Sequence, residues 1–209
     1  MRKIAVAALT LALLAPASAV WAVEQPRISD ISPIKLRSGP NTVPHFAPDG
    51  RDALIVLGWR DNGNAHGYDL YLVLMPASAA KPEWNVVGVD PGGNGRFQDI
   101  VTDDPHLGED AVRSIRFARA KVDGRPATVL FVATRDTGTA PIPDPAPVTF
   151  EVYRLAHNDG EVGYTVDYFT KIQEIKSTGK YCNAEMALRQ QFGIPLTASY
   201  NGPQTAEGC

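Results

Sequence analysis

The sequence lacks the short motifs that announce many catalytic sites. It holds only 2 cysteines, which do not form a C-x-x-C pair, and 4 histidines among 209 residues. It has no G-x-S-x-G nucleophile elbow, no H-E-x-x-H zinc motif and no G-x-x-x-x-G-K-[ST] phosphate loop. The sequence favours a non-catalytic role without deciding it, because catalytic partners can lie far apart in a chain.

The chain also lacks a strong charge of either sign. Its 20 Lys and Arg residues stand against 23 Asp and Glu residues, which gives a formal net charge of -3. Nucleic acids and anionic membranes attract clustered Lys and Arg. A mildly acidic chain therefore indicates no nucleic-acid partner and no anionic membrane surface as a partner.

The N-terminal residues 1–22 have the three-part pattern of a secretory signal peptide. Two basic residues precede an apolar run over residues 4–14, Pro16 ends that run, and small residues follow. A membrane anchor needs about 20 unbroken apolar residues, and no later segment is apolar enough to span a bilayer. We expect cleavage after Ala19 or Ala22, no membrane span after cleavage, and a periplasmic or secreted product.

The two cysteines, Cys182 and Cys209, fit an exported protein. Disulfides persist in oxidising compartments, and two cysteines allow one intramolecular bridge. That bridge would close a loop of about 28 residues and contribute roughly 3–4 kcal/mol by the chain-entropy argument. It would hold the polar C-terminal tail against the body of the protein, and two free thiols are the alternative.

Residues 23–209 have the size and composition of one domain. A Pro-rich segment, 23–48, is expected to lie extended over the surface. Short apolar runs separated by Gly, Asn and Asp then predict β-hairpins. The expected strands cover residues 53–59, 68–74, 84–89, 97–102, 112–122, 127–134, 148–155 and 162–168. The spacing after residue 168 allows either a bulged strand or a helical turn.

One helix is predicted over residues 183–192. Asn183 can cap its first turn and Gly193 can end it. A tail over residues 196–209 follows. The whole pattern predicts a mainly antiparallel β-sandwich or partly closed barrel with one short C-terminal helix.

The turn Pro44-His45-Phe46-Ala47-Pro48-Asp49-Gly50, followed by Tyr68-Asp69-Leu70-Tyr71, resembles one blade of a TolB-type β-propeller. The match covers about 30 residues, whereas a propeller typically needs at least four blades. The resemblance implies a similar turn geometry and carries no function.

Two stretches about 70 to 80 residues apart share a series of similar residues. Both contain an Asp-Gly-Arg turn and an apolar strand that ends in Arg-Asp, at Arg60-Asp61 and at Arg135-Asp136. Either an old duplication or the shared needs of hairpin turns explain this likeness. If the strands are equivalent, the loop with His66 and the Pro-rich loop 137–147 emerge at one end of the sheet. Loops gathered in this way often bind partners, so Arg60, Asp61, His66, Arg135 and Asp136 are candidate binding residues.

A second candidate site is an acidic loop. Four carboxylates and one imidazole fall within eight positions: Asp103, Asp104, His106, Glu109 and Asp110. Carboxylates alone suit Ca²⁺, while a histidine with carboxylates suits Zn²⁺ or Mn²⁺. A solvated loop between strands is the alternative, and we expect no other cofactor.

These features predict an exported binding or accessory protein of a bacterial-type cell envelope. It would act through a loop-bearing face on a protein or polysaccharide partner. A small metal-assisted hydrolase built on the loop 103–110 and a structural subunit of an envelope assembly are the alternatives. The sequence does not specify the oligomeric state.

Overall fold

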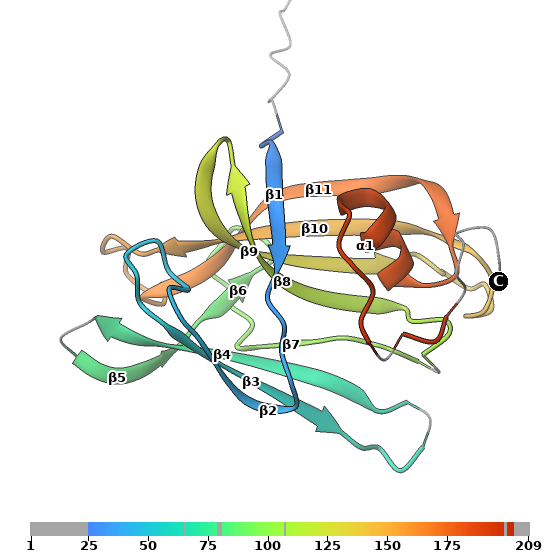
Figure 1. Ribbon diagram of the computed structural model, residues 1–209, viewed down its shortest axis with the longest axis horizontal. Helices are drawn as coiled ribbons and strands as arrows, with labels where there is room; N and C mark the ends of the chain where they lie inside the picture. The colour runs from blue at the N-terminus through green and yellow to red at the C-terminus, as the bar shows by residue number, and fades with distance from the viewer. Residues whose placement is uncertain (1–24, 65, 79–80, 107, 199, 203–209) are drawn as a thin grey trace, which may run out of the picture.

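The computed structural model describes residues 25–202, with residues 65, 79–80, 107 and 199 left out (Figure 1). Within these residues the chain forms eleven strands and one helix. They are β1 (Ile28–Pro33), β2 (Gly39–Val43), β3 (Ala53–Arg60), β4 (Tyr68–Ser78), β5 (Lys81–Val86), β6 (Gly88–Asp90), β7 (Ile100–Thr102), β8 (Arg113–Val122), β9 (Arg125–Arg135), β10 (Ala146–His157), β11 (Asp167–Tyr181) and α1 (Ala184–Phe192).

The described strands form two sheets that pack face to face. The six-stranded sheet has the order β1-β8-β9-β10-β11-β6, and only its β11–β6 pairing is parallel. The five-stranded sheet has the order β2-β3-β4-β5, with β7 also paired to β4. The predicted mainly β sandwich with one C-terminal helix is therefore confirmed. The two sheets stay separate and do not close into a barrel.

The six-stranded sheet is covered on both faces. One face packs on the five-stranded sheet around Phe46, Met75 and Phe117, which we call the inter-sheet core. The other face packs under α1 and the segment after it, around Phe150 and Leu188, which we call the helix core. The layers thus run from α1 through the six-stranded sheet to the five-stranded sheet (Figure 1).

Strand β8 shows how the alternation of a strand serves both cores. Ile115 and Phe117 lie in the inter-sheet core, while Ala118 and Ala120 lie in the helix core. Successive side chains of a strand point to opposite faces, so β8 supplies apolar residues to both cores. Its cations Arg113, Arg116, Arg119 and Lys121 interrupt the apolar residues, so the sequence of β8 shows no simple alternation of apolar and polar positions.

The helix forms where the sequence predicts it. The Asn183 side chain accepts a hydrogen bond of 2.8 Å from the backbone N–H of Glu185. Gly193 ends the helix at a φ of 68°, a left-handed conformation that glycine adopts without strain, and its N–H bonds to the carbonyl of Arg189. In the described part of the chain, no helix is long and apolar enough to cross a bilayer.

Four strand predictions differ from the structure. The expected strand 162–168 is mostly absent, because residues 161–166 lie in the turn between β10 and β11, which begins at Asp167. The Pro-rich segment contains two strands, β1 and β2, which pair in different sheets. The run 84–89 is divided between β5 and β6, which also lie in different sheets. The ambiguous residues after 168 belong to β11, whose pairing with β10 has two register shifts, consistent with the bulged-strand alternative.

Candidate functional site

The five-stranded sheet has an apolar face that points away from the inter-sheet core. Along β3 and β4, Ile55 and Val73 lie in that core, whereas Leu54 and Leu72 belong to neither core. We call this surface the outer apolar face. Its members are Leu54, Val56, Leu70, Leu72, Leu74, Pro76, Trp84, Val86 and Ile100.

The register of the sheet makes the outer apolar face continuous. Leu72 lies opposite Val56 on one side and opposite Ile100 on the other. Pro76 lies opposite Trp84 in the same way. Residues directly opposite each other in an antiparallel pair share one face and contact each other. The side chains therefore form one patch, in which Trp84 is 52% and Ile100 is 48% exposed.

No described element covers this patch. The contacts of α1 are with β8, β9, β10 and β11, on the far side of the six-stranded sheet (Figure 1). Antiparallel sheets with one solvated face usually place polar residues there. The outer positions of β3 and β4 are mostly aliphatic instead.

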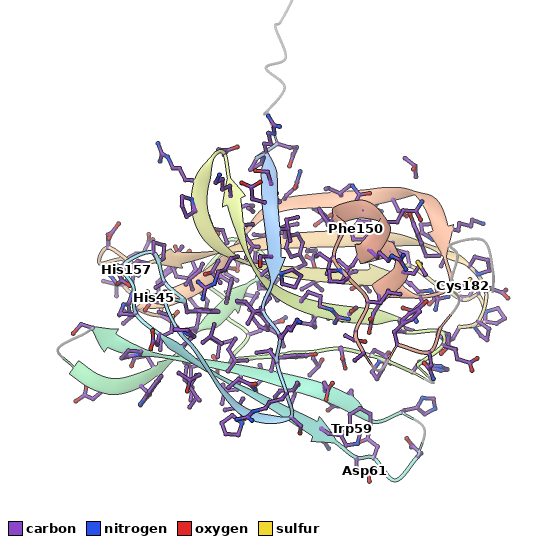
Figure 2. The ribbon with its side chains drawn as sticks, viewed as in Figure 1. His45, Trp59, Asp61, Phe150, His157 and Cys182 are labelled. Atoms are coloured by element: carbon purple, nitrogen blue, oxygen red, sulfur yellow. The ribbon has the colours of Figure 1, made fainter. Side chains whose placement is uncertain are left out.

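One end of the outer apolar face continues into the β3–β4 loop. Arg60 and Tyr68 lie opposite each other there, with the guanidinium 6.0 Å from the ring centroid. The neighbouring Trp59 is 56% exposed and lies near Asp61 at this end of the sandwich (Figure 2). A Cβ on Gly67 would come within 2.2 Å of the Trp59 ring, so only glycine at position 67 allows the ring to pack against the backbone there. Trp, Tyr and Arg are the residues enriched at binding hot spots.

The predicted binding residues divide into an exposed group and a buried one. Arg60, Asp61 and His66 are exposed on the β3–β4 loop, where Asp61 accepts a bond of 2.8 Å from the N–H of Gly63. Arg135 is only 2% exposed. Asp136 is exposed and accepts a bond of 2.9 Å from the Thr149 hydroxyl, so Arg135 alone is the buried one.

Arg135 is surrounded by backbone carbonyls. Its guanidinium donates to the carbonyls of Asp110, Tyr181, Ile142 and Asp144 over 2.6–3.0 Å. Burial lowers the pKa of Arg135, and the nearby Asp110 opposes that shift. Arg135 thus joins three segments of the chain, including the Pro-rich loop, and is not placed to receive a partner.

The acidic loop lies beside the same end of the sandwich. The rings of His66 and His106 have centroids 5.1 Å apart, and His106 Nδ1 lies 2.9 Å from the Asp110 carboxylate. Asp104 and Glu109 are exposed. The structure therefore brings His66 of the predicted binding group to the predicted metal loop.

Asp103 lies apart from those residues, with its carboxylate accepting a bond of 2.8 Å from the N–H of Asp69. Burial, assisted by repulsion from Asp69, raises the pKa of Asp103 to about 7. Among the described residues, no three His, Cys, Asp or Glu side chains are arranged to hold a metal ion. The metal site stays a prediction, and a rise in melting temperature with millimolar Ca²⁺ or Zn²⁺ would support it.

Sequence reasoning missed an ionic cluster between the two sheets. Arg51 donates two hydrogen bonds of 2.6 and 2.8 Å to the carboxylate of Asp167, and His157 Nδ1 lies 2.9 Å from the same carboxylate. Arg51 also bonds to Asp49 at 2.6 Å and to the Pro76 carbonyl at 2.8 Å. These bonds raise the pKa of Arg51. No local signal announces this cluster, because Arg51 and Asp167 are 116 positions apart.

A cavity of about 210 Å³ adjoins the cluster. The side chain of His157 is 52% exposed there, so Asp167 holds one imidazole nitrogen and leaves the other accessible. The nearby lining includes Ala47, Pro48 and Leu155, and no serine or cysteine. The arrangement can orient an imidazole, but the described lining offers it no side-chain nucleophile to activate.

Only one cysteine of the predicted disulfide lies within the described residues. Cys182 is 5% exposed, directly before the cap of α1, and Cys209 lies outside the described residues. The bridge therefore stays a prediction. The predicted signal peptide also lies outside the described residues.

Comparisons with known proteins bear on the fold alone. No protein-family model and no curated protein sequence matches the chain. A solved structure described as the crystal structure of CarG is similar, with a TM-score of 0.61 and 15% identity. The similarity covers 81% of this chain and 98% of that one. At this identity the likeness establishes a shared fold.

Proposed function

We propose that this protein is an exported binding or accessory protein that docks a partner protein through its outer apolar face. The observation that carries the proposal is the row of Val56, Leu72 and Ile100 across three neighbouring strands, outside both cores. Large apolar patches on soluble proteins commonly mark interaction sites, because they gain free energy when a partner removes them from water. The contact surface is thus the sheet face, with the β3–β4 loop at its rim.

The chemistry of the face indicates the partner that it fits. The centre is aliphatic, so it matches another apolar protein surface and offers few hydrogen bonds to a sugar. Trp84 can serve as an anchor at one end and Arg60, beside Tyr68, at the other. We therefore expect a partner with an apolar centre and a carboxylate that faces Arg60.

The number of residues favours a different protein over a second copy. A stable interface typically uses about 20–30 residues on each side. The outer apolar face has nine members, to which Arg60 and Tyr68 add a rim. An interface of this size suits a modest, reversible contact rather than a permanent homodimer.

Site-specific photo-cross-linking tests the proposal. A benzophenone amino acid is placed at Leu72 or at Trp84 in the full chain, and at Gln190, exposed on α1, as the control. We expect one protein adduct of the same mass from positions 72 and 84 and none from position 190. Adducts only between copies of the chain, or equal labelling from all three positions, would contradict a distinct protein partner.

The export component has a separate test. Cell fractionation of the full chain with a C-terminal tag should place a shortened product in the periplasm or medium. Substituting the apolar run 4–14 with polar residues should hold the uncleaved chain in the cytoplasm. A full-length cytoplasmic product from the native sequence would contradict export while leaving the docking test unaffected.

A further inference from the structure

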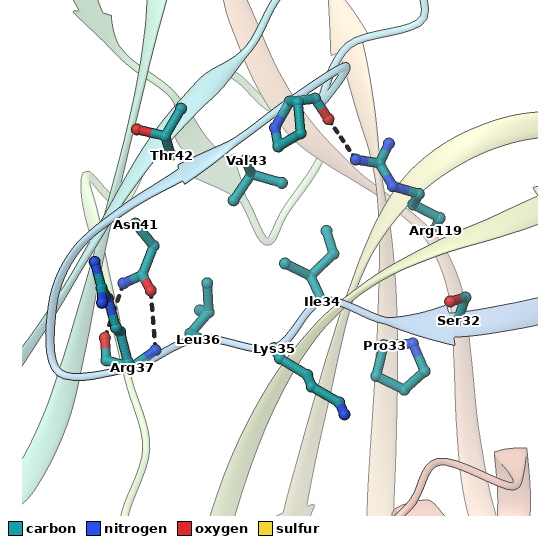
Figure 3. Close-up of a pocket in the computed structure, with 11 residues that line it drawn as sticks. Ser32, Pro33, Ile34, Lys35, Leu36, Arg37, Asn41, Thr42, Val43 and Arg119 are labelled. Atoms are coloured by element: carbon teal, nitrogen blue, oxygen red, sulfur yellow. Dashed lines mark hydrogen bonds between the residues drawn. The ribbon is translucent and has the colours of Figure 1, made fainter.

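The segment that links β1 to β2 crosses from one sheet to the other and borders a cavity of about 560 Å³ (Figure 3). The linker residues 34–37 form one wall and Asn41–Val43 of β2 form another. Arg119 of β8 closes a third side. This volume lies within the range of small-molecule sites, roughly 300–1,000 Å³.

Three cations line the cavity without a carboxylate among them. Lys35 and Arg37 are exposed at its edge, and Arg119 is partly buried. Among the described residues, none of these three side chains forms an ion pair. The chain as a whole carries a net charge of -3. The cavity is therefore a local positive site on an acidic protein.

Arg119 is fixed in position by neutral partners. Its guanidinium donates to the carbonyl of His45 at 2.6 Å and to the carbonyl of Pro44. Figure 3 draws one of these bonds as a dashed line from Arg119. A guanidinium has five N–H groups, and carbonyls leave its formal charge in place. Arg119 therefore keeps both its charge and further donors for a ligand, with little conformational entropy left to lose.

The linker is held in shape by Asn41. The Asn41 side chain accepts from the N–H of Arg37 at 2.9 Å and donates to the Arg37 carbonyl at 2.8 Å. It also donates to the Ile55 carbonyl at 3.2 Å, which ties the linker to β3. The cavity is thus preformed, so a ligand would not have to order its walls.

The remaining lining is apolar. Ile34 and Leu36 pack against the inter-sheet core, and Val43 is 5% exposed. A ligand that fills the cavity meets this apolar wall on one side and the three cations at the edge. Oxyanions gain most from guanidinium groups through charge-assisted hydrogen bonds.

We infer that this cavity binds a small amphiphilic anion, with a carboxylate or phosphate headgroup near Arg119 and an apolar chain against Ile34, Leu36 and Val43. The site is separate from the outer apolar face and adds a small ligand to the proposed partner protein. The two proposals can fail independently, because cross-linking from Leu72 does not depend on a ligand in this cavity.

Titrations followed by heteronuclear NMR of the ¹⁵N-labelled protein test the inference. The probes are octanoate, octyl phosphate and 1-octanol at equal concentrations below their aggregation limits. We expect octanoate or octyl phosphate to shift the amide signals of residues 34–37 and 41–43 and the Nε–H signal of Arg119. The anion that binds more tightly identifies the headgroup, and 1-octanol should bind at least tenfold more weakly.

Paired variants provide the control. Lys35→Gln with Arg37→Gln removes two exposed cations and should weaken anion binding about tenfold. Arg27→Gln with Arg125→Gln removes two exposed cations elsewhere and should change the affinity less than twofold. Arg119→Gln is expected to abolish binding, and the exposed pair keeps the test valid if that variant does not fold.

Three results would overturn the inference. They are equal binding of 1-octanol and the anions, unchanged affinity in the Lys35→Gln, Arg37→Gln variant, and shifts confined to the outer apolar face around Leu72.

Discussion

The Asp167 carboxylate accepts hydrogen bonds of 2.6 and 2.8 Å from the two terminal nitrogens of Arg51. Arg51 precedes β3 of the five-stranded sheet, and Asp167 begins β11 of the six-stranded sheet. Their side chains are 6% and 5% exposed. This bidentate pair therefore fastens the two layers together at one end of the sandwich, where water cannot easily replace it.

Breaking this pair should destabilise the protein strongly. Arg51→Met leaves the buried Asp167 carboxylate without its guanidinium, and we expect the free energy of unfolding to fall by about 3–5 kcal/mol. Urea denaturation followed by circular dichroism measures the change. Lys121→Met, which breaks the exposed pair of Lys121 with Asp30, is the control and should leave the urea midpoint nearly unchanged. Equal midpoints for the two variants would rule out a clamping role.

Arg135 should act on stability and on the Pro-rich loop together. Arg135→Met leaves the carbonyls of Asp110, Tyr181, Ile142 and Asp144 without this donor. Unpaired buried polar groups cost about 1–3 kcal/mol each, so the variant should unfold at clearly lower urea. Limited proteolysis should also cut first within residues 137–145. Thr149→Val removes the hydroxyl bonded to Asp136 and should leave the cleavage pattern native.

Neighbouring residues of β3 should separate stability from binding. Ile55 is fully buried in the inter-sheet core, and Ile55→Ala should cost about 2–5 kcal/mol through the cavity it leaves. Leu54 points to the outer apolar face, so Leu54→Ala should cost less than about 1 kcal/mol. Thermal unfolding measures both. In the cross-linking assay, Leu54→Ala should weaken the partner adduct although the fold is intact; an undiminished adduct would count against the docking surface.

Asp103 should make stability depend on pH. Its folded pKa of about 7 lies above the ordinary value of 3.8, so folding favours the protonated carboxyl. The unfavourable contribution is absent below pH 3.8, grows between pH 3.8 and about 7, and stays constant above. Asp103→Asn should therefore raise the melting temperature at pH 8 and change it little at pH 4. Asp104→Asn, at the exposed neighbour, should leave the pH profile of the native protein unaltered.

The bridge between Cys182 and Cys209 should be detectable in the exported protein. Mass spectrometry of a non-reduced digest should find the two cysteine peptides joined, and dithiothreitol should separate them. Reduction should lower the free energy of unfolding by roughly 3–4 kcal/mol, since the loop of about 28 residues is then unconstrained. Cys209→Ser should reproduce the effect of reduction. Two thiols that react with Ellman's reagent before reduction would show that the bridge is absent.

The sequence determined the features that depend on local patterns. Turn residues such as Asn158 and Gly160 mark hairpins because their side-chain and backbone preferences act over a few positions. The cap at Asn183 and the stop at Gly193 set the ends of α1 for the same reason. The mainly β fold and its single C-terminal helix could therefore be predicted, along with the loop end that holds Arg60, Asp61 and His66.

Only the tertiary structure decided how the strands are layered and which residues meet. β3 has the more continuous apolar run in the sequence, and β8 contains four cations, yet β8 has a covered layer on both faces and β3 on one. The difference arises from where α1 packs, which is a long-range contact that no local pattern encodes. The contacts of Arg51 with Asp167 and of Arg119 with the carbonyls of Pro44 and His45 are likewise long-range, since the packing of distant strands brings these residues together. The outer apolar face and the cationic cavity thus became visible only once the layers were in place.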